Sequence, residues 1–333
     1  MASIGGCAGF GAISGSSLAT VATITSVALP EMRKANYAPS MATGALAAGG
    51  TLGSLVPPSG ALIVFGIIAE QSIGTLFAAA IVPAITQALF YIAAIAILCR
   101  LKPELGPKIP RAPWGERLPA LKSIADIACM IVFVIGGLFI GWFTPTEAAS
   151  VGSVCALLIC WRRRRLTRAA VGGAFEATLR TTGVIYIVII GAILFATFIS
   201  VTGIADMLSR TVADLDAGPT AAIIVMALAL LVLGSFLDGL ALMLLTTPIF
   251  LPIVHDLGLS PIWFGIFLVR TMEIGFVHPP LGLNVYVIQG IAKDIPLQTI
   301  FRGIVPFLMA DFLHLALLIA IPGLVLWLPG VLA

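Results

Sequence analysis

The sequence predicts an all-α membrane protein that crosses the bilayer several times, on the evidence of composition and of the length of its apolar runs. Of its 333 residues, 60% are hydrophobic and 10% are charged, and the mean hydropathy is +1.13. A soluble globular chain is roughly 25% charged, so this composition excludes a soluble domain, a disordered chain and a nucleic-acid binder. The apolar runs are long enough for helices to cross a bilayer, whereas a β-barrel would show alternating segments of about ten residues.

Polar and basic breaks divide the chain into apolar elements, each expected to be a span or an arm of a helical hairpin. A hydrophilic loop at 100–122, rich in proline, lysine and arginine, is the clearest linker. Segment 202–217 carries three aspartates and one arginine and is expected at the membrane surface. The apolar elements are 9–29, 40–67, 75–99, 123–142, 146–161, 181–201, 219–254, 262–291 and 303–328.

The distribution of lysine and arginine orients these elements. The 100–122 loop and the arginine run at 162–165 are rich in positive charge, so the positive-inside rule places both in the cytoplasm. When the spans are counted from there, 9–29 becomes an arm of a hairpin open to the inside. The 219–254 element becomes a hairpin open to the outside, and the C-terminus is expected outside as well.

An internal repeat becomes visible when residues 28–60 are aligned with 250–282, an offset of 222. Each window contains four prolines, and all four coincide. The topology places the two copies in opposite orientations, and an inverted repeat with paired broken helices is typical of secondary transporters. The matched pairs are Pro30 and Pro252, Pro39 and Pro261, Pro57 and Pro279, Pro58 and Pro280, Gly53 and Gly275, and Gly60 and Gly282.

The matched double prolines interrupt apolar elements in mid-span. They break the helical hydrogen-bond ladder and free backbone carbonyl and N–H groups, which lipid tolerates only where protein packs against them or a cavity adjoins them. Freed carbonyls can coordinate a cation, and the N-termini of half-helices can face an anion. A kink that serves packing alone is the alternative interpretation of each break.

The same offset aligns two soft points inside apolar stretches, 14–17 and 236–239, and both are expected to be hairpin tips. The first tip offers the hydroxyl groups of Ser14, Ser16, Ser17 and Thr20. The second contains Asp238, a carboxylate in an apolar region, where a charge is unfavourable unless it is paired or functional.

The repeat predicts how the chain is divided. Residues 1–99 are the remainder of the first inverted repeat, 100–122 the cytoplasmic linker, and 123–333 the second repeat with its scaffold spans, hairpin, broken helix and last span. The second copy has three spans ahead of its hairpin that have no partners in the first copy. We therefore expect the chain to lack roughly 100 N-terminal residues of a complete two-repeat carrier.

Eight motifs spread over nearly the whole chain carry a resemblance to one known family. They are GAISGSSLATVAT at 11–23, PEM at 30–32, GTLGSLVPPS at 50–59, FTPTEAA at 143–149, FLDG at 236–239, PIFLP at 248–252, PIWFG at 261–265 and EIGFVHPPLGLN at 273–284. Taken together, they are similar to the large permease subunit of TRAP transporters, the tripartite ATP-independent periplasmic transporters (DctM-like).

This resemblance implies an elevator-type carrier of the ion-transporter superfamily, with re-entrant hairpins and broken helices, that is driven by sodium. It implies import of an organic acid anion, such as a C4-dicarboxylate, a sialic or other sugar acid, or a keto acid. The implied partners are a small four-helix membrane subunit and a periplasmic substrate-binding protein. The location would be the bacterial inner membrane, with the C-terminus in the periplasm and no cofactor beyond the coupling sodium ions.

The resemblance also implies two sodium sites, each between a hairpin tip and a helix break, with the substrate between the tips. These expectations are at the level of regions, not of single ligand atoms. The first region comprises Ser14, Gly15, Ser16, Ser17, Thr20, Gly53, Pro57, Pro58 and Ser59, and the second comprises Asp238, Gly239, Gly275, His278, Pro279, Pro280, Gly282 and Asn284.

His278 departs from the family pattern, because Thr or Ser usually precedes the double proline. A neutral histidine can donate or accept a hydrogen bond, but it is bulkier and would alter ion coordination or pH dependence. The alternative is a histidine that is turned toward packing.

Other polar residues inside apolar elements have local interpretations. Arg270 lies one turn before Glu273, so an ion pair inside the membrane is expected, with a substrate-binding arginine as the sharper alternative. Asp311 and His314 are neighbours on the last span, where a structural hydrogen bond is expected in preference to a proton relay. Glu147 is expected at a helix start, where its charge suits the positive end of the dipole.

Three functional hypotheses follow from these observations. The leading one is a sodium-coupled permease subunit that depends on a binding protein. The alternatives are a channel or carrier that works without a binding protein, and an incomplete, non-functional fragment of such a permease. An enzyme is disfavoured, because the sequence contains no HExxH, nucleophile-elbow, P-loop or paired-carboxylate motif.

Overall fold

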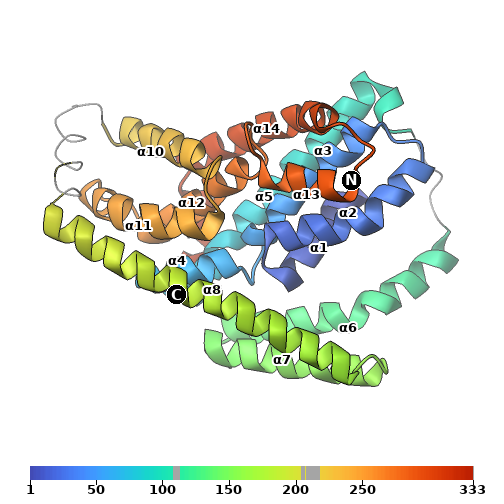
Figure 1. The fold of residues 1–333 in the computed structure, drawn as a ribbon, viewed down its shortest axis with the longest axis horizontal. Coiled ribbons are helices and arrows are strands. Elements are labelled where there is room, and N and C mark those ends of the chain that lie inside the picture. Colours follow the sequence, from blue (N-terminus) through green and yellow to red (C-terminus); the bar gives the residue numbers. More distant parts are fainter. Residues whose placement is uncertain (108–112, 204–206, 208–217, 333) are drawn as a thin grey trace. The chain divides into compact units, whose positions relative to one another are not determined.

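The computed structural model describes residues 1–107, 113–203, 207 and 218–332. These described residues form fourteen α-helices and a single 3-10 turn, without a strand among them (Figure 1). The predicted all-α class is therefore confirmed. The surface segment expected at 202–217 lies almost entirely outside the described residues.

The chain forms two compact units. The first comprises Met1–Pro107 and Ala192–Ala333, and the second comprises Lys108–Gly191. The first unit contains α1 (Ala2–Ser14), α2 (Ser17–Lys34), α3 (Pro39–Leu55), α4 (Gly60–Ile68), α5 (Ile73–Leu101), the 3-10 turn η1 (Pro103–Leu105), α10 (Gly218–Gly234), α11 (Gly239–Asp256), α12 (Pro261–Gly275), α13 (Leu283–Ile291), α14 (Leu297–Ala320) and α15 (Gly323–Leu332).

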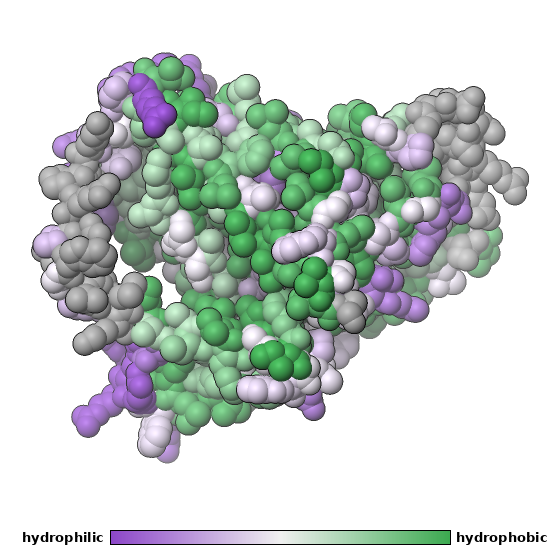
Figure 2. All heavy atoms as spheres, turned by 180° about the vertical axis from the view of Figure 1, so that it is seen from behind, coloured by the Kyte–Doolittle hydropathy of each residue, from purple (hydrophilic) through white to green (hydrophobic). Residues whose placement is uncertain are grey.

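Several helices are long and apolar enough to cross a bilayer. By length and composition four single helices qualify, namely α5, α8, α11 and α14, and a fifth span results if α3 and α4, which bend by 42° at their break, count as one. On the face drawn in Figure 2, hydrophobic residues cover most of the surface and hydrophilic ones gather toward its margins. These findings confirm a polytopic membrane protein, and the bend confirms a broken helix at the first double proline.

The helix bounds of the first unit repeat along the chain at the offset found in the sequence. Adding 222 to the ends of α2, Ser17 and Lys34, gives Gly239 and Asp256, which are the ends of α11. Helix α3 begins at Pro39 and α12 at Pro261, and in both the proline occupies the first turn, where its missing N–H needs no partner. The prolines therefore predicted where these helices begin.

Both expected hairpins are present. Helices α1 and α2 pack against each other, as do α10 and α11, with turns at residues 15–16 and 235–238. Gly15 ends α1 in the left-handed conformation at φ 60°, and a Cβ there would lie 2.8 Å from the carbonyl oxygen of Pro58. Only glycine fits such a turn without strain, so the first tip is built around Gly15.

Helices α3 and α12 form the centre of the first unit. Every residue at 41–55 of α3 and at 263–275 of α12 is buried, and the two helices contact each other. Each also packs closely on its own hairpin, because Gly11 lies against Gly53 and Gly234 against Gly275, and a Cβ on Gly11 or Gly275 would lie within 3 Å of the facing backbone. This packing of small residues brings each hairpin against a broken helix.

The two copies of the repeat also exchange contacts. Helix α2 packs against α13, and α11 packs against α4, so each hairpin arm contacts the half-helix of the other copy. Near the end of α2, Arg33 forms an ion pair of 2.9 Å with Asp294, in the loop after α13. That hydrogen bond holds the pKa of the Asp294 carboxyl below its usual value. The fold thus interlocks its two copies.

The second unit contains α6 (Trp114–Phe139) and α7 (Pro145–Arg162), which pack together, and the first part of α8 (Arg168–Thr202). Helix α7 begins with a capping box between Thr144 and Glu147, which confirms the helix-start role expected for Glu147. Arg162 and Arg163, from the basic run at 162–165, form ion pairs with Asp126 on α6.

Candidate functional site

The first hairpin tip lies directly against the break between α3 and α4. The amide of Gly60 donates to the carbonyl of Gly15 at 3.2 Å, and the hydroxyls of Ser14 and Thr20 are 2.8 Å apart. A Cβ on Gly53 would lie 2.6 Å from the carbonyl oxygen of Ser16. The structure therefore brings the residues of the first expected region together, and we name this place the first junction.

The break itself is held by a serine. Ser59 caps α4 by accepting from the amide of Leu62 at 3.3 Å, and its hydroxyl donates to the backbone carbonyl of Ser54. Pro57 and Pro58 lie in the non-helical segment between the two half-helices. The polar atoms that line the first junction are hydroxyl and carbonyl oxygens, the donor set that hard cations prefer and that broken helices of transporters present to sodium. The residues present fit a small hard cation.

A carboxylate from the second copy reaches this junction. Glu273 of α12 is fully buried, and the hydroxyl of Ser17 lies 2.7 and 2.6 Å from its two carboxylate oxygens. The Ser17 hydroxyl is also 2.9 Å from that of Ser54 on α3, whose oxygen accepts the backbone N–H of Ser17 at 3.2 Å. Glu273 thus joins the hairpin and the broken helix of the first copy.

The prediction that Arg270 forms an ion pair with Glu273 is wrong. Arg270 instead donates to Asp311 on α14 at 2.8 Å, and both side chains are fully buried. The physical reason is that α12 is buried around its whole circumference. Residues one turn apart therefore face different neighbours: Arg270 faces α14, and Glu273 faces α2 and α3.

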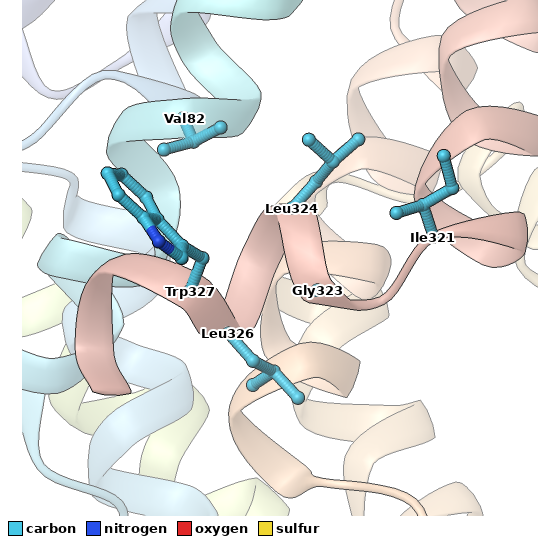
Figure 3. A pocket seen from close by; sticks show the side chains of 6 residues that line it. All are labelled: Val82, Ile321, Gly323, Leu324, Leu326 and Trp327. Atoms are coloured by element: carbon cyan, nitrogen blue, oxygen red, sulfur yellow. The ribbon is translucent and has the colours of Figure 1, made fainter. Parts of the chain in front are cut away.

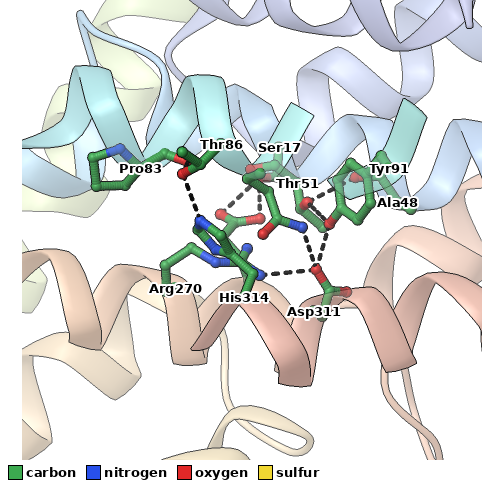
Figure 4. A network of polar contacts seen from close by, with 11 residues as sticks. Ser17, Ala48, Thr51, Pro83, Thr86, Tyr91, Arg270, Asp311 and His314 are labelled. Atoms are coloured by element: carbon green, nitrogen blue, oxygen red, sulfur yellow. Dashed lines mark hydrogen bonds and ion pairs between the residues drawn. The ribbon is translucent and has the colours of Figure 1, made fainter. Parts of the chain in front are cut away.

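Asp311 is the centre of a buried polar network (Figure 4). One of its oxygens accepts from Gln87 at 2.7 Å, from Tyr91 at 2.6 Å and from Arg270. Tyr91 continues the network to the hydroxyl of Thr51 at 2.8 Å. The network therefore ties α3, which ends at the first junction, to α5, α12 and α14.

His314 does not bond to Asp311, contrary to the expectation from their spacing. Its ring nitrogen lies 2.8 Å from the hydroxyl of Thr86 on α5. Gln87 and Tyr91 were missed by the sequence analysis, although they are polar residues one turn apart in an apolar element. That spacing is the signal that would have found them.

The second junction, where the second tip meets the break between α12 and α13, has different chemistry. Asp238 is exposed, and its carboxylate caps α11 by accepting from the amide of Leu240 at 3.2 Å. Gly239 packs closely against the side chains of Met272 and Phe276. Asp238 is therefore a helix cap at an exposed tip, and it makes no contact with Glu273.

The remaining residues of the second region lie at the break. His278 is partly buried, and its ring packs edge-on against Phe312 at 6.3 Å, which favours the packing interpretation of this residue. Pro279 and Pro280 are exposed, and Gly282 adopts the left-handed conformation at φ 61°. Asn284 is buried and donates to the carbonyl of Ala47 on α3 at 3.2 Å. Gly275 packs on Gly234.

Two surface pockets lie away from both junctions. One, of about 550 Å³, is apolar and is lined by residues of α5, the turn before α15 and α15 itself (Figure 3). The other, of about 370 Å³, includes Lys102 and Arg302. Neither contains a residue of the expected site. Within the described ranges there is also no cluster of His, Cys, Asp or Glu that would suit a transition metal.

Comparison with known proteins gives a consistent result. The chain matches the family described as "Tripartite ATP-independent periplasmic transporter, DctM component" over residues 1–324. It is 33% identical to the C4-dicarboxylate TRAP transporter large permease protein DctM of Pseudomonas aeruginosa, covering 99% of this chain and 77% of that protein.

Two further relatives carry other substrate names. The chain is 32% identical to the sialic acid TRAP transporter large permease protein SiaM of Vibrio cholerae, covering 96% of this chain and 74% of the relative. It is 33% identical to the ectoine TRAP transporter large permease protein TeaC of Halomonas elongata, covering 97% and 75%. The substrates for which these relatives are named differ although their similarity to the chain is nearly equal, so similarity does not select one substrate.

Proposed function

Because the chain belongs to the DctM family of tripartite ATP-independent periplasmic transporters, we propose that it imports an organic acid anion by sodium-coupled symport. It is a transporter permease subunit and not an enzyme. The observation that carries the sodium proposal is the first junction, where hydroxyl and carbonyl oxygens of a hairpin tip and a broken helix lie close together and a buried carboxylate adjoins them. Oxygen ligands with a nearby negative charge suit a small monovalent cation.

The substrate would bind between the two hairpin tips. C4-dicarboxylates, sugar acids and keto acids are the classes we propose, since the relatives include permeases named for C4-dicarboxylate, sialic acid and 2,3-diketo-L-gulonate. The N-termini of α4 and α13 follow the two breaks, and such helix ends favour anionic groups.

The proposed setting follows from the family. A small membrane subunit would complete the permease, and a periplasmic binding protein would deliver the substrate. The complex would lie in the bacterial inner membrane, with the C-terminus of this chain in the periplasm, an orientation that the distribution of Lys and Arg favours.

Uptake by reconstituted vesicles tests the proposal. The chain, together with a small membrane subunit and a binding protein, would be reconstituted and given a labelled organic acid in the presence of an inward sodium gradient or an equal potassium gradient. We expect saturable uptake only with sodium and with the binding protein. Uptake that persists without sodium contradicts sodium coupling, and uptake without the binding protein supports a carrier that works alone.

A further inference from the structure

We propose that Glu273 is a positioning residue for the coupling cation, although it belongs to the other copy of the repeat. It accepts the hydroxyl proton of Ser17, which in turn contacts the hydroxyl of Ser54, and thereby orients the hydroxyl oxygens that meet at the first junction. Its charge also provides the negative counterpart that a cation at the junction requires. The inference rests on the proposed sodium coupling and assigns one residue a specific part in it.

The direction of the hydrogen bonds follows from the chemistry of the groups. An ionised carboxylate only accepts hydrogen bonds, whereas a serine hydroxyl has one proton and two lone pairs. The Ser17 hydroxyl lies 2.6 Å from one oxygen of Glu273, and its alternative acceptor, the Thr51 carbonyl, is 3.5 Å away. When Glu273 is ionised, the Ser17 proton therefore points to its carboxylate, and the Ser17 lone pairs face elsewhere.

Ser54 shares this arrangement. Its hydroxyl lies 2.9 Å from that of Ser17, and it accepts the backbone N–H of Ser17 at 3.2 Å. Because the Ser17 proton points to Glu273, the Ser54 hydroxyl donates to Ser17, and the chain of donors ends at Glu273. Two hydroxyls at the meeting point of hairpin and break are thus fixed in one polarity. A hydroxyl can act as a cation ligand only through its lone pairs.

The charges of the buried residues also support a cation beside Glu273. Within the part of the chain that the structure describes, the fully buried residues with formal charges are Arg270, Glu273 and Asp311. Arg270 and Asp311 form an ion pair with each other, and the nearest partners of Glu273 are neutral hydroxyls. A buried carboxylate is strongly unfavourable without a counter-charge, and a cation at the first junction would supply the counter-charge that keeps Glu273 ionised.

Sodium-dependent stabilisation of the purified chain is the primary test. Melting temperatures would be measured against rising NaCl, with KCl held so that ionic strength is constant, because a ligand that binds only the folded state raises the melting temperature. We expect Glu273→Gln to raise the half-saturating sodium concentration by about tenfold, as befits the loss of a hydrogen bond to a charged group. Glu273→Asp should show a smaller rise, and Glu176→Gln, an exposed residue of α8, should show none.

A second readout separates positioning from mere structural support. In uptake assays, Glu273→Gln should raise the half-saturating sodium concentration while the maximal rate at saturating sodium falls much less. Loss of fold alone would lower the melting temperature equally in sodium and potassium. If Glu273→Gln does not yield folded protein, Glu273→Asp decides the same question.

The outcomes distinguish this inference from the proposed function. A wild-type chain that sodium does not stabilise more than potassium, and whose uptake ignores sodium, contradicts the proposed function itself. A wild-type chain that responds to sodium, together with a folded Glu273 variant whose half-saturation is unchanged, overturns only the role of Glu273.

Discussion

The two hairpin–break junctions share a backbone plan but differ in chemistry. Helix bounds, double prolines and close glycine contacts recur at the offset of 222. In the first junction, hydroxyls and a buried carboxylate meet, whereas the second is packed by Met272 and Phe276 below an exposed Asp238. Glycine and proline set where the chain turns, and the residues between them set what each turn can bind.

Three positions account for most of this difference. Ser17 corresponds to Gly239, Ser54 to Phe276, and Thr51 to Glu273. The second copy therefore gives its carboxylate to the first junction and keeps an aromatic and a glycine at its own. If the comparison is right, substitutions in the buried network around Asp311, which joins α3 of the first junction to α12 of the second, should weaken both junctions. Substitutions at the tips should affect the two junctions unequally.

The largest effect is expected in the buried network around Asp311. Replacing Arg270 by Met leaves Asp311 buried without its cation, which should destabilise the protein by about 3–5 kcal/mol. The double variant R270M/D311L, which removes both charges, should recover most of that loss. Unfolding in bicelles measures both, and Arg302→Met, at an exposed residue of α14, is the control. If R270M lowers the free energy of unfolding by less than about 1 kcal/mol, the network around Asp311 does not support the two junctions.

The backbone plan could be predicted from the sequence because glycine and proline act locally. Proline has no N–H and fixes φ, so matched prolines marked the starts of α3 and α12 and the two breaks without knowledge of distant contacts. Gly15 lies within the predicted tip, and its positive φ is likewise a local property that glycine permits.

The partners of the buried charges could not be predicted in this way. Ser17 and Glu273 are 256 positions apart, and Arg270 and Asp311 are 41 apart. Spacing predicted that Arg270 and Glu273 share a helix turn, but not that α12 is enclosed on all sides. When a helix has no exposed face, hydrophobic periodicity no longer tells which neighbour a polar side chain meets.

The next largest effect compares the two tips directly. Gly15→Ala should cost about 2 kcal/mol, because the residue has a positive φ and its Cβ would approach the rigid backbone of Pro58. Gly239→Ala should cost less, about 1 kcal/mol, because its φ is not positive and the atoms its Cβ would meet belong to the side chains of Met272 and Phe276, not to the backbone. Melting temperatures and uptake rates of the two variants test this order. Equal losses would mean that both tips are equally constrained.

A smaller effect is expected at the exposed tip alone. Asp238→Ala removes the cap of α11 and should destabilise by about 1 kcal/mol. Asp238→Asn keeps an accepting oxygen and should be nearly neutral in melting temperature. If Asp238→Asn instead abolishes sodium dependence, the carboxylate has a role beyond capping, and the second junction is closer in chemistry to the first than the contacts indicate.

The smallest effect concerns a pair of residues matched by the repeat. Thr25 of α2 and Thr247 of α11 are fully buried, and within the described residues neither hydroxyl has a hydrogen-bond partner. Replacing an unpaired buried hydroxyl by a methyl group is neutral or stabilising, so Thr25→Val and Thr247→Val should each change stability by less than about 1 kcal/mol. Uptake is then the informative measurement. Equal behaviour of the two variants means that the copies differ only at their tips and breaks. Loss of uptake in Thr25→Val alone means that the functional difference extends along the hairpin arm, beyond the first junction.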